Sequence, residues 1–327
     1  MPIISVRSLS KHYLIAEKLP GIRGTFKHFI SRKERDVTAV DNINFEIQQG
    51  EIVGFIGSNG AGKTTTLKML CGLIHPSSGS IIVGGYTPIH RDKNFLRQIT
   101  LVMGQKQQLI WDLPPLDSLR VNAAVYGLNP KEANKRIEEL ASMLELDSEL
   151  IRPVRKLSLG QRMKAELLAA LLHRPSVLFL DEPTLGLDIN AQIRVREFLA
   201  KYNQLYGATI LLTSHYMGDI TSLCKRVLLI HEGMIFYDGE LLELTDKVSP
   251  TRCVKIELSE TIPKEKFVNF GDVIQYHGCF VRILIPRREL TTKLSIILDQ
   301  FPVRDLEVSD PPIEEMIGKI ISTGSIN

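Results

Sequence analysis

The sequence contains little cysteine, a single tryptophan and no long apolar run. Its four cysteines, Cys71, Cys224, Cys253 and Cys279, lie far apart and form no Cys-x-x-Cys pair, so a disulfide scaffold is not expected and a reduced, cytosolic compartment is favoured. No stretch approaches the roughly 18 apolar residues that a membrane-spanning helix needs. The N-terminus lacks the charged start and apolar region of a signal peptide. If the protein serves a membrane, we expect it to act from the surface through a partner.

The positive and negative charges of the chain nearly balance. The formal net charge is +3, which by itself gives no reason to expect a nucleic acid as a partner. The 327 residues exceed one average domain, so we expect a large domain followed by a smaller one. The residue pattern changes near Pro250, which predicts a first domain of residues 1–245 and an accessory α+β domain of residues 246–327.

Against these absences stands one glycine-rich stretch, Gly57-Ser58-Asn59-Gly60-Ala61-Gly62-Lys63-Thr64-Thr65. The pattern Gly-x-x-x-x-Gly-Lys-Thr is that of a phosphate-binding loop, whose backbone N–H groups surround phosphates. Lys63 would reach the β- and γ-phosphates, and the Thr64 hydroxyl would meet Mg²⁺. Residues 51–56 favour a buried strand and residues 64–71 a helix, whose N-terminus attracts anions. The alternative is a glycine-rich surface turn, which these flanks do not favour.

Two acids follow a second buried-type strand at residues 176–182. Asp181 and Glu182 stand at its carboxyl end, where an α/β sheet does its chemistry. Asp181 would hold Mg²⁺ directly or through water, and Glu182 would polarise the attacking water. Salt-bridged surface acids are the alternative interpretation.

Four further polar residues have two interpretations each. Gln105 ends a strand that begins at Ile99, and it could bind Mg²⁺, position water or be a polar loop residue. His215 ends a strand that begins at Ala208, and it could face the γ-phosphate or be structural. Ser158 precedes an apolar helix, which it could cap or use to hold an anion. Tyr13 could stack on an adenine or be a half-buried tyrosine at a strand end.

The remaining pattern predicts the other elements. Strands are expected at residues 3–9 and 37–47, and residues 106–153 have helical character, with Asn129 as a helix cap. The insertion from Leu14 to Asp36 carries six basic residues, and Phe26, Phe29 and Ile30 have helical spacing. It predicts a basic amphipathic helix against a membrane surface or a partner, with a solvated charged face as the alternative. Residues after 250 favour antiparallel strands, a helix at 290–299 and a terminal helix at 313–321.

The order of these motifs resembles that of the ATP-binding subunit of an ABC transporter, from about Ile3 to Leu244. The phosphate loop corresponds to Walker A, Gln105 to the Q-loop, Leu157 to Gln161 to the signature, Asp181 to the end of Walker B, Glu182 to the catalytic glutamate, Asp188 to the D-loop and His215 to the switch histidine. Leu159 departs from the family pattern, because it replaces the usual first glycine of the signature.

The resemblance implies a fold, a chemistry and a site. The fold is an α/β P-loop NTPase core with an antiparallel β subdomain, a helical subdomain at about 106–160 and a small C-terminal α+β domain. The activity is ATP hydrolysis with Mg²⁺. The implied catalytic residues are Glu182, His215, Lys63 and Gln105, and the implied metal ligands are Thr64, Gln105 and Asp181. The implied ATP contacts are the phosphate loop, Tyr13, Ser158, Gly160, Gln161 and Asp188.

The branch and the partners are implied in the same way. Residues 104–114, the basic insertion and the short C-terminal domain look like those of ABC-2-type exporter ATPases, among them sodium-export and antibiotic-resistance relatives. This implies a separate permease, a homodimer that sandwiches ATP, and a peripheral position on the cytoplasmic face of the membrane. A ribosome-associated ABC ATPase is the alternative, although such chains normally carry two nucleotide domains. An SMC-type DNA-repair ATPase would need a long coiled coil, and an inactive subunit would not keep Lys63, Asp181, Glu182 and His215.

Overall fold

The structure is a computed structural model, which describes residues 2–16, 34–104, 108–214, 216–248 and 251–309. The chain forms two compact units, Met1–Gly239 and Glu240–Asn327. Several predicted features lie outside the described residues, namely Gln105, His215, the helix expected around Phe26, Phe29 and Ile30, and the terminal helix at 313–321. Within the described part of the chain, no helix combines the length and the hydropathy that crossing a membrane requires.

The first unit contains a six-stranded sheet of order β5-β6-β7-β3-β8-β9. The strands are β3 (Ile52–Ile56), β5 (Ile99–Met103), β6 (Val177–Asp181), β7 (Thr209–Thr213), β8 (Arg226–His231) and β9 (Met234–Glu240). The pairs β5–β6, β6–β7, β7–β3 and β3–β8 are parallel. Every residue of β6 and β7 is buried, which explains why both strands are apolar throughout rather than alternating.

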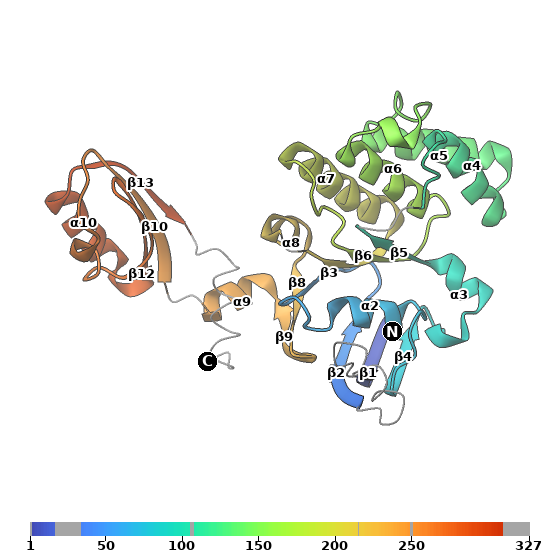
Figure 1. Ribbon diagram of the computed structural model, residues 1–327, viewed down its shortest axis with the longest axis horizontal. Helices are drawn as coiled ribbons and strands as arrows, with labels where there is room; N and C mark the ends of the chain where they lie inside the picture. The colour runs from blue at the N-terminus through green and yellow to red at the C-terminus, as the bar shows by residue number, and fades with distance from the viewer. Residues whose placement is uncertain (1, 17–33, 105–107, 215, 249–250, 310–327) are drawn as a thin grey trace, which may run out of the picture. The chain divides into compact units, whose positions relative to one another are not determined.

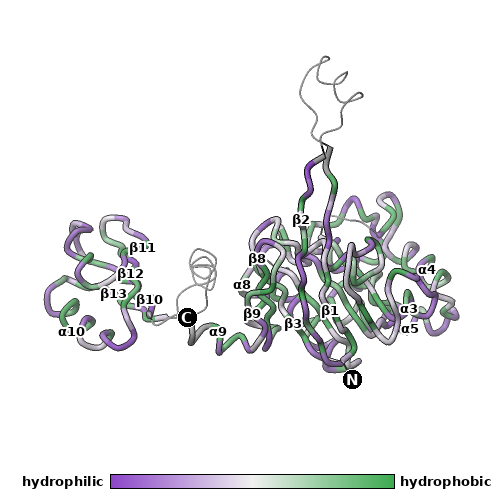
Figure 2. Tube along the Cα trace, turned by 90° about the horizontal axis from the view of Figure 1, so that it is seen from below, coloured by the Kyte–Doolittle hydropathy of each residue, from purple (hydrophilic) through white to green (hydrophobic). Residues whose placement is uncertain are grey.

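A three-stranded antiparallel sheet of order β2-β1-β4 lies beside it. Its strands are β1 (Ile4–Ala16), β2 (Glu34–Ile47) and β4 (Ser78–Val83). The first two are longer than the predicted strands at 3–9 and 37–47, and Figure 2 shows them running on side by side as a ribbon. Tyr13 therefore lies inside β1, opposite Val37, and its interpretation as a tyrosine at a strand end was wrong.

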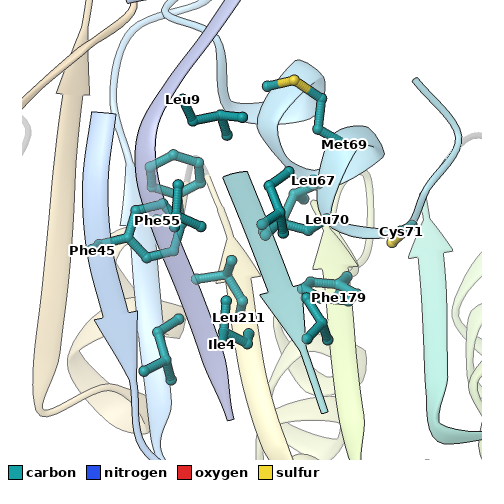
Figure 3. Close-up of a cluster of buried hydrophobic side chains, with 14 of the residues drawn as sticks. Ile4, Leu9, Phe45, Phe55, Leu67, Met69, Leu70, Cys71, Phe179 and Leu211 are labelled. Carbon is teal, nitrogen blue, oxygen red and sulfur yellow. The ribbon is translucent and has the colours of Figure 1, made fainter. Parts of the chain in front are cut away.

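The helix α2 (Lys63–Leu70) packs in the core that the two sheets share. Figure 3 shows Phe45 of β2, Phe55 of β3, Leu67 of α2 and Phe179 of β6 gathered in one cluster. All four side chains are almost completely buried. Burial of this amount of apolar surface holds the start of α2, and with it the glycine-rich loop, in place.

The helices on the side of the six-stranded sheet opposite to α2 form the helical part of the first unit (Figure 1). They include α4 (Pro115–Val125), α5 (Pro130–Leu144), η2 (Val154–Lys156), α6 (Leu159–Leu171) and α7 (Ile189–Tyr206). As predicted, α5 begins at Asn129, whose side chain accepts a hydrogen bond from the Glu132 N–H at 2.9 Å. The remaining short helices are η1 (Pro88–His90), α3 (Lys93–Gln98) and α8 (Met217–Leu223).

The second unit contains a four-stranded antiparallel sheet of order β11-β12-β10-β13. Its elements are α9 (Leu241–Val248), β10 (Thr251–Leu258), η3 (Lys264–Lys266), β11 (Asp272–His277), β12 (Phe280–Pro286), η4 (Arg287–Glu289), α10 (Leu290–Gln300) and β13 (Val303–Ser309). Phe267 and Ile297 of α10 complete its apolar core. The predicted fold class, an α/β core with an antiparallel sheet, a helical part and a small α+β unit, is confirmed.

Candidate active site

The glycine-rich loop turns tightly between β3 and α2, and its glycines are required by close packing. A Cβ at Gly57 would lie 2.1 Å from the Ile230 carbonyl oxygen, and one at Gly62 would lie 2.4 Å from the Ala39 carbonyl oxygen. Gly62 also has a φ of 109°, which favours glycine. Any larger residue at either position would push the loop away from its neighbours.

The loop has a base at residues 61–63, which is held by hydrogen bonds, and a rim at residues 58–60, which is exposed. The Ala61 N–H donates to the Ser58 carbonyl at 3.1 Å, and the Gly233 N–H, from the turn between β8 and β9, donates to the Ala61 carbonyl at 3.0 Å. Ala61 and Lys63 are buried, whereas Ser58 and Asn59 are exposed. The backbone of the rim is thus accessible above a rigid base at the N-terminus of α2, an arrangement that suits phosphate groups.

Lys63 is held across this loop. Its ammonium group donates to the carbonyl oxygens of Gly57 at 2.8 Å and Ser58 at 3.0 Å. Burial lowers the pKa of Lys63, and the nearby carboxylates of Glu182 and Asp181 oppose that shift. A cation kept among carbonyl groups and carboxylates is poised for an anionic ligand.

Asp181 connects the loop to the sheet. Its Oδ2 accepts a hydrogen bond from the Thr64 hydroxyl at 2.9 Å, and its Oδ1 accepts one from the Thr213 hydroxyl at 2.7 Å. Since the Thr64 hydroxyl donates its proton to the carboxylate, its lone pairs remain available to a cation. Hydroxyl and carboxylate oxygens are ligands that Mg²⁺ prefers, so Thr64 and Asp181 fit this metal together with phosphate oxygens.

The ends of three parallel strands form one row beside these groups. Met103 of β5 pairs with Asp181 of β6, which pairs in turn with Thr213 of β7. The Gly104 N–H donates to the Asp181 carbonyl at 3.1 Å. Gln105 and His215 follow this row by one or two residues, although both lie outside the described residues.

Glu182 has an unusual backbone at this row. Its φ of 56° is left-handed, a conformation that costs a non-glycine residue about 1–2 kcal/mol. The N–H of Glu182 donates to the carbonyl and to the hydroxyl of Thr213, both at 3.1 Å. These bonds compensate for the strain and fix the backbone of Glu182 directly beside Asp181.

A second group of predicted residues gathers at the starts of α6 and α7. The Ser158 hydroxyl accepts from the Gln161 N–H at 3.2 Å, and the Gln161 side chain accepts from the Ser158 N–H at 3.0 Å. Asp188 caps α7 by accepting from the Ala191 N–H at 2.9 Å. A Cβ on Gly160 would lie 2.9 Å from the Ala191 Cβ, so the two helix starts are in contact.

The capping interpretation of Ser158 is therefore confirmed, and it leaves the side chain exposed at the helix start. Leu159, the residue that departs from the family pattern, is 46% exposed. It lies over Gly186, where a Cβ would be 3.3 Å from the leucine side chain. The substitution thus lies against the start of the loop that leads to α7.

Tyr13 lies on the β1–β2 ribbon near the loop. It is half-buried, and the Lys11 ammonium group lies 5.0 Å from its ring centroid. Its partner Val37 is two residues from Ala39, the residue whose carbonyl approaches Gly62. Two residues of a strand span about 7 Å, so this part of the ribbon passes close to the base of the loop.

Sequence reasoning missed three polar residues near the strand ends. Thr213 binds Asp181, and Thr184 and Ser214 both donate to the buried carboxylate of Asp219. The available signal was the run Thr213-Ser214 directly before His215, because polar residues that end a buried strand are unusual. The partners of this run are remote in sequence and could not be identified from it.

Comparisons with known proteins agree with this arrangement. Residues 40–185 match the family model described as ABC transporter, and residues 250–309 match one described as EvrA-like ABC transporter, C-terminal domain. The chain is 36% identical over 212 residues to the ABC transporter ATP-binding protein NatA of Bacillus subtilis (strain 168), covering 65% of this chain and 86% of that protein.

A second relative is the Nod factor export ATP-binding protein I of Burkholderia pseudomallei (strain 1710b). It is 38% identical over 214 residues, which cover 64% of this chain and 68% of that protein. Among solved structures, one titled "Structure of ATP binding subunit of ABC transporter" has a TM-score of 0.62 and 27% identity. It covers 75% of this chain and 92% of the solved chain.

Proposed function

Because this chain belongs to the family of ABC transporter ATP-binding proteins, and so binds ATP with Mg²⁺ and hydrolyses it, we propose that it powers export through a separate ABC-2-type permease. The observation that carries the site assignment is the bond from Thr64 to Asp181, which joins the phosphate loop to the strand ends. Export is supported by the resemblance to exporter ATPases and by the relative named for Nod factor export.

The phosphate loop and the strand ends form the nucleotide half-site. The backbone of residues 57–65 surrounds the phosphates, and Lys63 exchanges its two carbonyl partners for β- and γ-phosphate oxygens. Thr64, Asp181 and Gln105 would hold Mg²⁺, which when bound would supply positive charge beside the phosphates. Tyr13 stacks on the adenine, because the ribbon passes near the loop base.

Hydrolysis proceeds by in-line attack of water on the γ-phosphate. Glu182, which directly follows β6, accepts a proton from the water, and His215, two residues after β7 in the sequence, contacts the γ-phosphate. Lys63 stabilises the charge on the transferring phosphoryl group. Glu182 and His215 both follow, in the sequence, strands whose last residues pair with each other, Asp181 of β6 and Thr213 of β7.

A second copy of the chain supplies the other half-site. Ser158, Gly160 and Gln161 at the start of α6, together with Asp188, would face the γ-phosphate held by the opposing copy. The start of α6 offers backbone N–H groups and a favourable helix dipole to an anion. ATP therefore joins the two copies, and its hydrolysis releases them.

A groove in the first unit is proposed as the docking site of the permease. Its volume is about 760 Å³, and its lining includes Leu73 and Val125, which are 53% and 73% exposed. Arg91, Lys93 and Arg97 also line it. An apolar surface with basic residues suits an amphipathic helix with acidic residues. We propose that the permease presents such a helix, which places this chain on the cytoplasmic face of the membrane.

The domain assignment remains part of the proposal. We assign residues 1–245 to the ATPase domain, with its helical subdomain at about 106–160, and residues 246–327 to an accessory domain. The division into Met1–Gly239 and Glu240–Asn327 supports a boundary in this region. None of the comparisons favours the ribosome-associated alternative, because the relatives are named for transport.

The variant Glu182→Gln tests the mechanism. It removes the general base but keeps the shape, so turnover should fall about 10²–10⁴-fold while ATP affinity is retained. Gel filtration with Mg-ATP should then show a persistent dimer. Glu138→Gln, at an exposed position on α5, is the matched control and should behave as wild type. A Glu182→Gln protein that stays monomeric at high concentration with Mg-ATP would contradict the sandwich.

The variant Val125→Asp tests the docking site. A carboxylate in the groove should abolish co-purification of the permease and leave the ATPase activity of the isolated subunit unchanged. Leu205→Asp, at a position on α7 that is 57% exposed, is the control and should retain the permease. Undiminished co-purification of Val125→Asp would refute the assignment of this groove.

A further inference from the structure

One buried carboxylate outside the nucleotide site joins three segments of the first unit. Asp219 belongs to α8, and its side chain is 1% exposed. Its Oδ1 accepts a hydrogen bond from Arg196 Nε at 2.6 Å, and its Oδ2 accepts one from the Ser214 hydroxyl at 2.5 Å. The Thr184 hydroxyl also donates to Oδ2.

The three donors belong to segments that carry predicted site residues. Ser214 directly precedes His215, and Thr184 follows Glu182 by two residues. Arg196 lies on α7, the helix that Asp188 caps. Asp219 therefore contacts neighbours of the catalytic glutamate and of the switch histidine, together with the helix that begins at the D-loop.

The Ser214 hydroxyl has a second role. While it donates to Asp219, it accepts from the Tyr216 N–H at 3.0 Å. This bond spans position 215, so the backbone on both sides of that position is tied to one buried group. A change of the Ser214 side-chain rotamer, which moves the oxygen itself, would break both contacts at once.

The network depends on all of its members. A buried carboxylate is unfavourable unless charged and hydrogen-bonding partners compensate it. Arg196 supplies the opposite charge, and the two hydroxyls satisfy the remaining oxygen. Since the oxygens of Asp219 are shared, a displacement of one segment changes the hydrogen bonds available to the other two.

We propose that Asp219 is a positioning residue for ATP hydrolysis, which holds the segments after Glu182 and around position 215 in the arrangement needed for catalysis. The inference rests on the proposed roles of Glu182 and His215. Asp219 does not touch the nucleotide in this scheme. It acts through Thr184 and Ser214, and Arg196 makes its burial tolerable.

Two mild variants test the inference without leaving a buried charge unpaired. Thr184→Val and Ser214→Ala each remove one hydroxyl donor and keep the Asp219–Arg196 pair. Each should lower the kcat for ATP by about 10- to 100-fold, the effect of losing one hydrogen bond to a charged group. The KM for ATP should stay near the wild-type value, because the phosphate loop is unchanged, whereas the thermal midpoint should fall by a few degrees, because the lost bond also stabilises the folded state.

The matched control is Ser222→Ala. Ser222 lies on the same helix, and its hydroxyl donates to the backbone carbonyls of Gly218 at 2.6 Å and of Asp219 at 3.2 Å, not to the Asp219 carboxylate. This variant should keep the wild-type kcat. The double variant Thr184→Val/Ser214→Ala should lose less than the product of the two single losses, since both hydroxyls act through one carboxylate.

Three outcomes would overturn the inference. They are an unchanged kcat in Ser214→Ala and Thr184→Val, a rise of the KM for ATP in parallel with the loss of kcat, which indicates a merely structural role, and an equal loss of kcat in Ser222→Ala. These outcomes differ from a failure of the proposed function, because in that case the wild-type protein itself would show no Mg-dependent ATPase activity.

Discussion

We predict that acid destabilises the first unit through His173. This histidine follows α6, and its ring stacks on that of Tyr126 with centroids 3.8 Å apart. Its Nε2 lies 3.3 Å from the Ile99 carbonyl oxygen, which can only accept, so Nε2 carries the proton of this hydrogen bond. Burial lowers the pKa of His173 from 6.5 to about 4, and Arg136 contributes to the shift.

The sign follows from proton uptake in the two states. The unfolded chain binds a proton at His173 below about pH 6.5, whereas the folded protein binds it only near pH 4. In this interval the unfolded state holds more protons, so the free energy of unfolding falls as the pH falls. Between pH 7 and pH 5 this histidine should account for a loss of about 2 kcal/mol.

The assay uses the single tryptophan. Trp111 belongs to the first unit, so its fluorescence during urea unfolding reports that unit. His173→Phe keeps the ring stack on Tyr126 and removes the titrating group. The variant loses the bond to the Ile99 carbonyl at every pH, so the informative quantity is the change in unfolding free energy between pH 7 and pH 5, which should be about 2 kcal/mol smaller in the variant. Equal pH dependence in both proteins would refute the reasoning.

Three other predictions concern the site and the ribbon. Lys63→Ala should weaken ATP binding about 10- to 100-fold in a nucleotide titration, because it removes a charged donor, and unchanged affinity would contradict its assignment. Gly160→Ala should reduce ATP turnover, since its Cβ would lie 2.9 Å from that of Ala191; Ala191→Gly should restore turnover, and failure of that rescue would refute the steric cause. Replacing residues 17–33 by an Asn-Gly turn, which the Ala16–Glu34 pair can accommodate, should weaken co-sedimentation with anionic vesicles or the permease at low salt but not ATPase activity, because each lost basic residue contributes about 1 kcal/mol; unchanged co-sedimentation would indicate a solvated insertion.

The phosphate loop and the strands around it could be predicted because their signals are local. Glycines at fixed spacing, an apolar run and a helix start stand next to one another in residues 51–71. The buried stripe of α5 was equally visible, since one face repeats with helical period. The residues of that stripe are all buried, namely Ala133, Ile137, Leu140, Ala141 and Leu144.

The length of β1 and β2 could not be predicted, because none of residues 11–14 of the ribbon is buried. Leu14 is 70% exposed, and its pairing with Asp36 depends on a partner 22 residues away. Exposed strands held only by each other leave no apolar pattern in the sequence.

The hydrogen-bond partners of Asp219 could not be predicted from the sequence for a different reason. Asp219 lies 35 residues from Thr184, and no motif joins them. Which polar residues share a buried site depends on how β6, α7 and β7 pack, and that arrangement is a property of the folded sheet. Local spacing identified Glu182 and His215 as candidates, but it contained no information about the residues that support them.

The two hydrogen bonds from Lys63 to the loop carbonyls affect which ligands the loop can bind, because a ligand must replace both of them. The ammonium group leaves Gly57 and Ser58 only for a partner that offers more negative charge than two neutral dipoles. In the proposed site a nucleotide with a single phosphate places no charge where the β- and γ-phosphates would lie, so we expect it to gain no binding energy from this lysine. We therefore expect the affinity of the loop to depend on the number of phosphates in the nucleotide. After hydrolysis, the carbonyl groups of Gly57 and Ser58 would compete with the remaining phosphates for the ammonium group of Lys63.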